Sequence, residues 1–303
     1  MNFLIFAITY PIIWILSKLP MRILYIKSDF LYLILYYVIG YRKKVVYDNL
    51  RLSFPKKSNK ELKNISKDFF RHFTDLFVET VKSVSINEKE ILKRYKYKNP
   101  ELVNKYVKEG RSIALTGAHQ ANWEWSSSSP LVLNCNVNGA YSHLRNKYFD
   151  KLVKETRERF GIICYESSKT VKAIHTDFSK NKTGAYILLS DQSPQFHKTT
   201  YWKTFFGINV PIYTGAEALS KRYNLVVINC ATKKIKRGYY ETEFQLITDN
   251  PKNNNKFEIT DKYIQLTEEC IKKQPQYYLW SHKRFKHKDR FNEWKQLKIA
   301  KSK

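Results

Sequence analysis

Acidic residues are scarce in this chain: 27 Asp and Glu stand against 54 Lys and Arg, which gives a formal net charge of +27. Such an excess points to an anionic partner, which is a nucleic acid, an anionic membrane surface or a phosphorylated substrate. Part of the excess is compositional, because lysine, asparagine, tyrosine and isoleucine are all used heavily.

Cysteine is also scarce, and its spacing excludes two classes of protein. No CxxC pair or Cys/His spacing typical of a zinc site is present, and nothing indicates a disulfide framework. We expect ordinary buried thiols in a reducing compartment. The four cysteines are Cys135, Cys164, Cys230 and Cys270.

Two functional signatures are missing as well. The chain has no helix-turn-helix, zinc-finger or RNP pattern, and its tyrosines are spread out rather than clustered with basic residues, which disfavours nucleic-acid binding. It also has no G-x-S-x-G elbow. The serine run 126–129 is the only candidate nucleophile, and its place after Trp125 favours packing on a helix surface.

The N-terminus lacks the features of a cleaved signal peptide, because no basic residue precedes the apolar run 1–19 and no small-residue cleavage site follows it. The run is close to the roughly 20 residues that span a bilayer. Tyr10, Pro11 and Trp14 interrupt it, so an interfacial anchor and a buried helical hairpin remain open. We predict a hydrophobic membrane anchor over residues 1–40, with the bulk of the chain cytoplasmic.

Apolar strands alternate with amphipathic helices from about residue 95 onward. This order predicts an α/β domain with a mixed, largely parallel sheet flanked by helices, behind an N-terminal helical membrane-anchoring segment. Ser58 and Glu61 form a predicted capping box, and 204–211 is predicted to be a loop. Strands are expected at 95–97, 113–115, 137–141, 162–165, 185–189 and 225–230, with 239–247 an antiparallel edge strand; helices at 41–53, 58–84, 123–133, 147–160, 171–178, 214–223 and 261–274.

Polar side chains follow two of the predicted strands. His119 and Glu124 come after strand 113–115, and Asp191 with Gln192 comes after strand 185–189. Ligand sites in open α/β sheets lie at such strand ends. A histidine with a carboxylate can remove a proton from a hydroxyl group, although this spacing alone equally fits a loop histidine with a chance acidic neighbour.

Five blocks of this sequence carry a family resemblance: GAHQANWEW, YSHLRNKYFDKLVKETRERFG, LLSDQSP, FFGINVPIYTGAEALSKRYN and WSHKRFK. They resemble the late, lauroyl/myristoyl acyltransferases of lipid A biosynthesis, within the glycerophosphate and lysophospholipid acyltransferase superfamily. The blocks agree in order and spacing over about residues 40 to 290. One departure is Ser142-His143 after Tyr141, where the family has a basic residue and proline; Arg145 is a substitute for that charge.

The resemblance implies a role for each matching residue. His119 would be the general base and Glu124 would complete a dyad with it. Arg157 would stabilise the oxyanion or a phosphate, and Asp191 would orient Arg157 or position the acceptor. Contacts to the substrates are expected from Asn122, Trp123, Arg145, Arg159 and Gln192.

The resemblance also implies an O-acyltransferase at the cytoplasmic face of the inner membrane. It would take an acyl chain from acyl carrier protein or coenzyme A, need no metal or other cofactor, and acylate a phosphorylated glycolipid. A lysophospholipid, an aminolipid or another glycolipid stays open as the acceptor. We expect the acyltransferase domain over residues 41–295 and a basic tail over 296–303, with an acidic carrier protein and an anionic membrane surface as partners and no nucleic acid.

Overall fold

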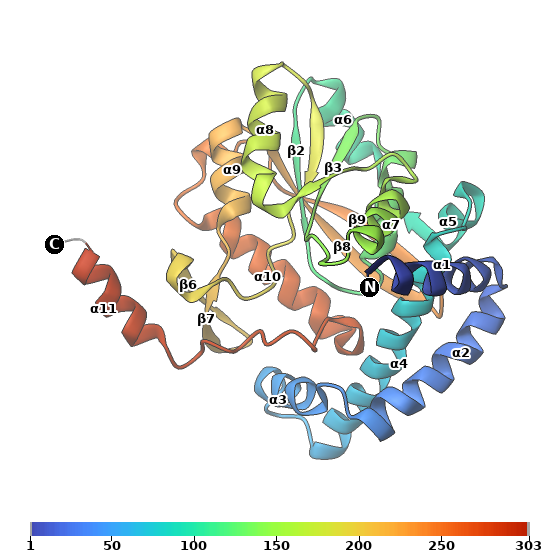
Figure 1. Ribbon diagram of the computed structural model, residues 1–303. Coiled ribbons are helices and arrows are strands. Elements are labelled where there is room, and N and C mark those ends of the chain that lie inside the picture. The colour runs from blue at the N-terminus through green and yellow to red at the C-terminus, as the bar shows by residue number, and fades with distance from the viewer. Residues whose placement is uncertain (1, 302–303) are drawn as a thin grey trace.

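Seven strands form one sheet in the order β1-β9-β8-β2-β5-β3-β4, seen in this computed structural model, which describes residues 2–301 (Figure 1). Neighbouring strands are parallel except β8 and β9, which are antiparallel. The mixed, largely parallel sheet expected from the sequence is therefore confirmed. The strands are β1 Tyr95–Tyr97, β2 Ile113–Gly117, β3 Asn136–Tyr141, β4 Ile163–Glu166, β5 Gly184–Ile187, β8 Val226–Lys236 and β9 Tyr239–Thr248.

Helices cover both faces of this sheet because successive side chains of its central strand point in opposite directions. Ile113 and Leu115 of β2 pack on the same side as Tyr106 of α6, whereas Ala114 packs with side chains of α8, α9 and α10. The helices are α1 Asn2–Lys18, α2 Met21–Leu33, α3 Lys43–Ser53, α4 Asn59–Ser83, α5 Glu88–Arg94, α6 Glu101–Lys108, α7 Lys147–Glu158, α8 Thr170–Ser179, α9 Gly215–Tyr223, α10 Glu258–Lys273 and α11 Phe291–Lys301, with a π-helix η1 at Ile34–Ile39 and a 3-10 helix η2 at Glu124–Leu131.

Helix α4 joins the N-terminal helices to the sheet domain. It begins with the predicted capping box: the Ser58 hydroxyl accepts from the backbone N–H of Glu61, and the Glu61 carboxylate accepts from that of Ser58. Ser28 of α2 donates a hydrogen bond of 2.8 Å to the buried carboxylate of Asp75, which lies in α4. The predicted anchor segment thus packs on the sheet domain through α4.

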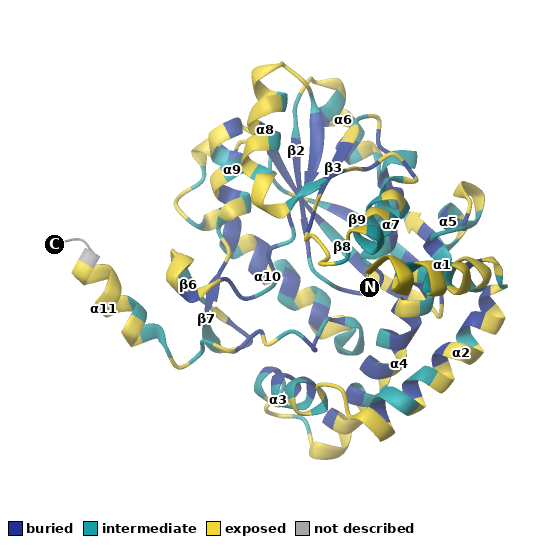
Figure 2. Cartoon of the chain, in the orientation of Figure 1, coloured by how far each residue is buried: buried dark blue, intermediate teal, exposed yellow. Residues whose placement is uncertain are grey.

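Part of the N-terminal segment keeps apolar side chains exposed, visible as the yellow stretches of α1 and α2 in Figure 2. Within residues 2–301 no single helix has both the length and the apolarity to cross a bilayer. One bent pair, Met21–Ile39 with Lys43–Ser53, meets both criteria together across a bend of 92°.

Three local predictions were wrong. The predicted loop 204–211 lies in a hairpin whose turn is Phe206–Gly207, with both φ angles positive, and Phe-Gly lacks the usual turn residues. The predicted edge strand is covered by β1, so β9 lies inside the sheet. The predicted helix 123–133 is η2, a 3-10 helix of 8 residues that contains four serines and Pro130. The hairpin strands are β6 Tyr201–Phe205 and β7 Ile208–Ile212.

The C-terminal segment is helical over most of its length. Residues 296–301 of the predicted basic tail belong to α11, which begins at Phe291. Residues 302–303 lie outside the described part of the chain.

Candidate functional site

A groove of about 1270 Å³ lies where β2, β3 and β5 end, and we call it the central groove. These three strands are neighbours and parallel, so their carboxyl ends lie along one edge of the sheet. Helix α7, the 3-10 helix η2, strand β4 and Thr80 of α4 also contribute to its lining. The polar side chains in it include His119, Glu124, Ser126, Ser127, Tyr141 and Arg157.

One buried carboxylate holds His119 in two places. The Oδ1 atom of Asp191 lies 2.8 Å from Nδ1 of the ring, and its Oδ2 atom accepts a hydrogen bond of 3.0 Å from the backbone N–H of His119. A carboxylate can only accept, so Nδ1 carries the proton and Nε2 keeps its lone pair. The ring is 21% exposed whereas Asp191 is 1% exposed, which leaves Nε2 as the nitrogen available to a ligand.

The pKa of His119 is raised and the pKa of Asp191 is lowered, so both shifts favour the charged form of the residue. Burial acts to lower the pKa of His119, but the charge and the hydrogen bond of Asp191 outweigh it and raise the pKa above 6.5. Burial acts to raise the pKa of Asp191, and the facing imidazole lowers it below its ordinary value. Asp191 thus stays ionised while His119 becomes a stronger base.

Glu124 lies at the start of η2 and is bound by Arg157, from the last turn of α7. Nε and Nη2 of Arg157 donate to the two oxygens of Glu124 over 2.9 Å and 2.7 Å. A guanidinium has five N–H groups, and this fork uses two of them. Three N–H groups therefore remain to bind an oxyanion or a phosphate at the groove.

The hydrogen bonds differ from the pairing expected from the sequence, in which Glu124 completes a dyad with His119 and Asp191 orients Arg157 or positions the acceptor. The reason is topological. Strand β5 lies directly beside β2, so Asp191 arrives next to His119. After His119 the chain reverses at Ala121, where φ is +54°, and Glu124 then lies toward α7. Glu124 contributes to the raised pKa of His119 only as a more distant charge.

Two of the five expected substrate contacts lie beside the His119 ring. Trp123 packs edge-on against the imidazole with 5.3 Å between ring centres. The Nε2 atom of Gln192 lies 3.4 Å from Nε2 of His119, which is the position that an incoming hydroxyl group would take.

The other three do not lie beside that ring. Asn122 is buried, donates to Glu79 over 2.6 Å and accepts from the backbone N–H of Trp125, so its amide is already occupied. Arg159 donates to the backbone carbonyl of Val84 at the end of α4. Arg145 is exposed in the segment between β3 and α7.

A buried carboxylate that the sequence gave no reason to select holds this loop. Glu79 of α4 accepts hydrogen bonds from Asn122, from Tyr240 of β9 and from Tyr25 of α2. Burial raises the pKa of Glu79 to about 7. His72 is buried on the same helix, with its Nε2 3.1 Å from the carbonyl oxygen of Ala121.

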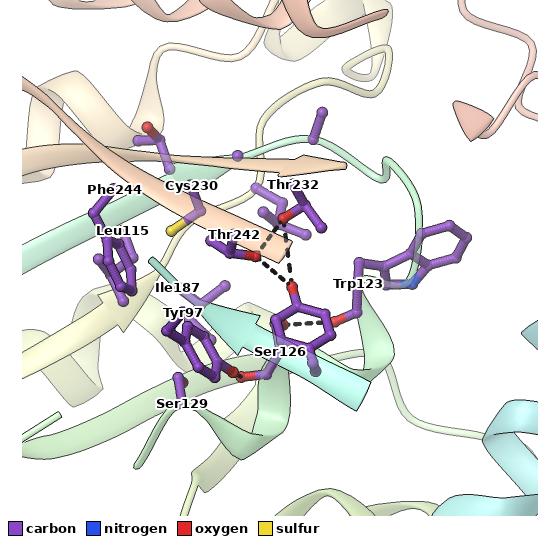
Figure 3. Close-up of a pocket in the computed structure, with 15 residues that line it drawn as sticks. Tyr97, Leu115, Trp123, Ser126, Ser129, Ile187, Cys230, Thr232, Thr242 and Phe244 are labelled. Atoms are coloured by element: carbon purple, nitrogen blue, oxygen red, sulfur yellow. Dashed lines mark hydrogen bonds between the residues drawn. The ribbon is translucent and has the colours of Figure 1, made fainter. Parts of the chain in front are cut away.

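Sequence reasoning also missed an apolar cavity beneath Trp123, between η2 and the sheet, which we call the sheet cavity (Figure 3). It shares Trp123, Ser126, Ile187 and Leu189 with the central groove, so the two spaces adjoin. The only sequence feature that could have indicated this cavity was the alternation of side chains between the two faces of β2, β5, β8 and β9. Its remaining lining includes Leu115, Cys230 and Phe244.

Comparison with known families gives one match over nearly the whole chain. A family model described as bacterial lipid A biosynthesis acyltransferase matches residues 2–287. No curated protein matches the chain. The matched range contains every residue of the central groove.

Proposed function

The chain belongs to the bacterial lipid A biosynthesis acyltransferase family, and on that premise we propose that it transfers a fatty acyl chain from a thioester to a hydroxyl group of a phosphorylated lipid A precursor. The thioester is that of acyl carrier protein or coenzyme A, and it is a co-substrate rather than a cofactor. The observation that carries the proposal is the hydrogen bond between Asp191 and His119, which keeps the lone pair on Nε2, the nitrogen that faces Gln192.

The proposed step needs one base and no covalent enzyme intermediate. Nε2 of His119 takes the proton of the acceptor hydroxyl while its oxygen attacks the thioester carbonyl carbon. The tetrahedral oxyanion then collapses, the carbon–sulfur bond breaks, and the leaving thiolate takes the proton from the imidazolium. Asp191 stabilises the imidazolium and keeps the ring in its reactive tautomer throughout.

Arg157 is proposed to stabilise the oxyanion or to hold a phosphate of the acceptor. Its three remaining N–H groups and its position in the lining of the central groove support this role. In this proposal Glu124 acts through Arg157, because its carboxylate fixes the plane of the guanidinium.

The sheet cavity is proposed to hold the acyl chain that is transferred. Leu115, Ile187 and Phe244 line it, and it adjoins the groove beside Trp123. Three hydroxyls in its wall are hydrogen-bonded to one another, Thr232 to Thr242 over 2.8 Å and Thr242 to Tyr95 over 2.7 Å, so these three need no polar ligand (Figure 3).

Attachment to the cytoplasmic face of the inner membrane is proposed through α1, α2 and η1. Exposed isoleucine, leucine and aromatic side chains on these helices support it, together with basic residues nearby, which favour anionic lipid headgroups. The same positive excess suits an acidic carrier protein. The most exposed of these apolar side chains are Leu4, Ile8, Ile26, Phe30, Val38 and Ile39.

The proposal is tested with the purified full chain in mixed micelles. Acyl-acyl carrier protein and acyl-coenzyme A are each offered with a lipid A precursor, and separately with a lysophospholipid, and the products are weighed by mass spectrometry. We expect one added acyl chain on the lipid A precursor. Acylation of the lysophospholipid alone would contradict the acceptor, and no ester product with any acceptor would contradict the activity.

A further inference from the structure

A second apolar cavity adjoins the central groove, and we call it the helix cavity. It occupies about 610 Å³ between α1, α4, α7 and η2. Most of its lining is carbon, from Val81 of α4 and from Phe149, Leu152 and Val153 of α7. A largely apolar space beside a polar site is suited to an alkyl chain.

The helix cavity adjoins the site of the reaction. Thr80, Glu124, Ser127, Val153 and Arg157 line both it and the central groove. The ion pair between Glu124 and Arg157 therefore lies at the boundary between them. A chain in this cavity would have its polar end beside the free N–H groups of Arg157.

Helix α1 separates this cavity from the exposed apolar surface. Ile13 lines the cavity, and its neighbours Ile12 and Ile15 are exposed on the outside of the same helix, at 54% and 58%. Phe6 packs against Phe149 with 5.2 Å between ring centres, which joins α1 to α7. The cavity is thus next to the surface proposed to meet the lipid bilayer.

We propose that the helix cavity binds an alkyl chain that the acceptor lipid already carries, while the sheet cavity takes the chain being transferred. This assignment rests on the proposed acyl transfer. The sheet cavity adjoins the central groove at Trp123, whereas the helix cavity adjoins it at Arg157. A membrane-resident acceptor reaches the cavity beside α1 without leaving the lipid phase, whereas a thioester arrives from a water-soluble carrier.

Variants that fill the helix cavity distinguish the binding of the acceptor's alkyl chain from the binding of the transferred acyl chain. Thr156 lines this cavity alone, and its hydroxyl is bonded only to its own helix, at Leu152, so Thr156→Phe adds bulk at small cost. Val81→Phe fills the cavity from α4 and covers the case in which the first variant does not fold. Thr176→Phe, on the exposed face of α8, is the matched control.

We expect Thr156→Phe to raise KM for a long-chain acceptor by about tenfold, the loss that follows when two methylenes no longer leave water. KM for a short-chain analogue of the same acceptor and the preference among donor chain lengths should stay unchanged. Cys230→Phe, in the sheet cavity, should instead shift the donor preference toward shorter chains. Equal effects on both acceptors, or a changed donor preference in Thr156→Phe, would overturn the assignment.

A binding readout keeps this test separate from the proposed activity. A phosphorylated glycolipid with a diazirine on one chain should label peptides of α7 or α4 in the wild-type chain, and Thr156→Phe should reduce that labelling whereas Thr176→Phe should not. Labelling without any acyl transfer would refute the activity and leave the cavity as a lipid site. Transfer without labelling of either helix would refute the cavity assignment alone.

Discussion

Replacement of Asp191 by asparagine should lower kcat for acyl transfer by on the order of 10⁴. Asp191 accepts from both the backbone N–H and the ring of His119. An asparagine satisfies the backbone N–H with its carbonyl, which turns its NH₂ group toward Nδ1. That group donates, so the ring proton moves to Nε2, and the lone pair that takes the substrate proton is lost.

The matched comparison is His119→Ala, which removes the base itself and gives the residual rate that remains without it. Both variants should bind membranes as the wild type does, and their circular dichroism should be unchanged. The rate is measured as ester product formed per minute from a saturating thioester donor. An Asp191→Asn variant within about tenfold of wild type would contradict the orienting role of Asp191.

Replacement of Arg157 by alanine should lower kcat by about 10²–10³, the usual cost of removing one oxyanion donor. Arg157→Lys should recover little of this, because an ammonium group cannot make the two-pronged contact with Glu124 while donating to the substrate. Glu124→Gln keeps one acceptor for the guanidinium and should have a smaller effect than either change at Arg157.

The ranking of the carboxylate variants separates two accounts of the site. If Asp191 orients His119, Asp191→Asn is the more damaging substitution and Glu124→Gln the milder one. If Glu124 were the partner of His119 during the reaction, Glu124→Gln would be as damaging as Asp191→Asn. The same assay under the same conditions measures both.

The sequence was sufficient to predict the seven strands of the main sheet and the residues at their ends, but not the hairpin of β6 and β7 or the 3-10 helix η2. His119 and Asp191 each follow a short apolar strand, and parallel strands in an α/β domain bring such residues to one edge. The order of those strands was not predictable from periodicity. Strand β5 comes after β3 and β4 in the chain but is inserted beside β2, and that placement decides which carboxylate meets His119.

The residues that hold the site in place could not be predicted from the sequence either. Glu79 lies on a helix whose apolar stripe was predicted, but its partner Tyr240 is 161 positions away, and no local pattern links the two. Asn122 lies within the motif that carries His119, yet it serves Glu79 and the start of η2 rather than a ligand. Such roles depend on contacts between distant segments, which neither propensity nor spacing encodes.

The acid limb of the pH–rate profile tests the central claim most directly, because in kcat/KM it reports the pKa of the base in the free enzyme. Asp191 raises the pKa of His119 above 6.5, and the base works only when neutral. We therefore predict that kcat/KM for acyl transfer falls as the pH drops, with its midpoint above 6.5 in the wild-type chain and no such limb in the residual rate of His119→Ala. A midpoint at or below 6.5, or the same limb in His119→Ala, would contradict the account.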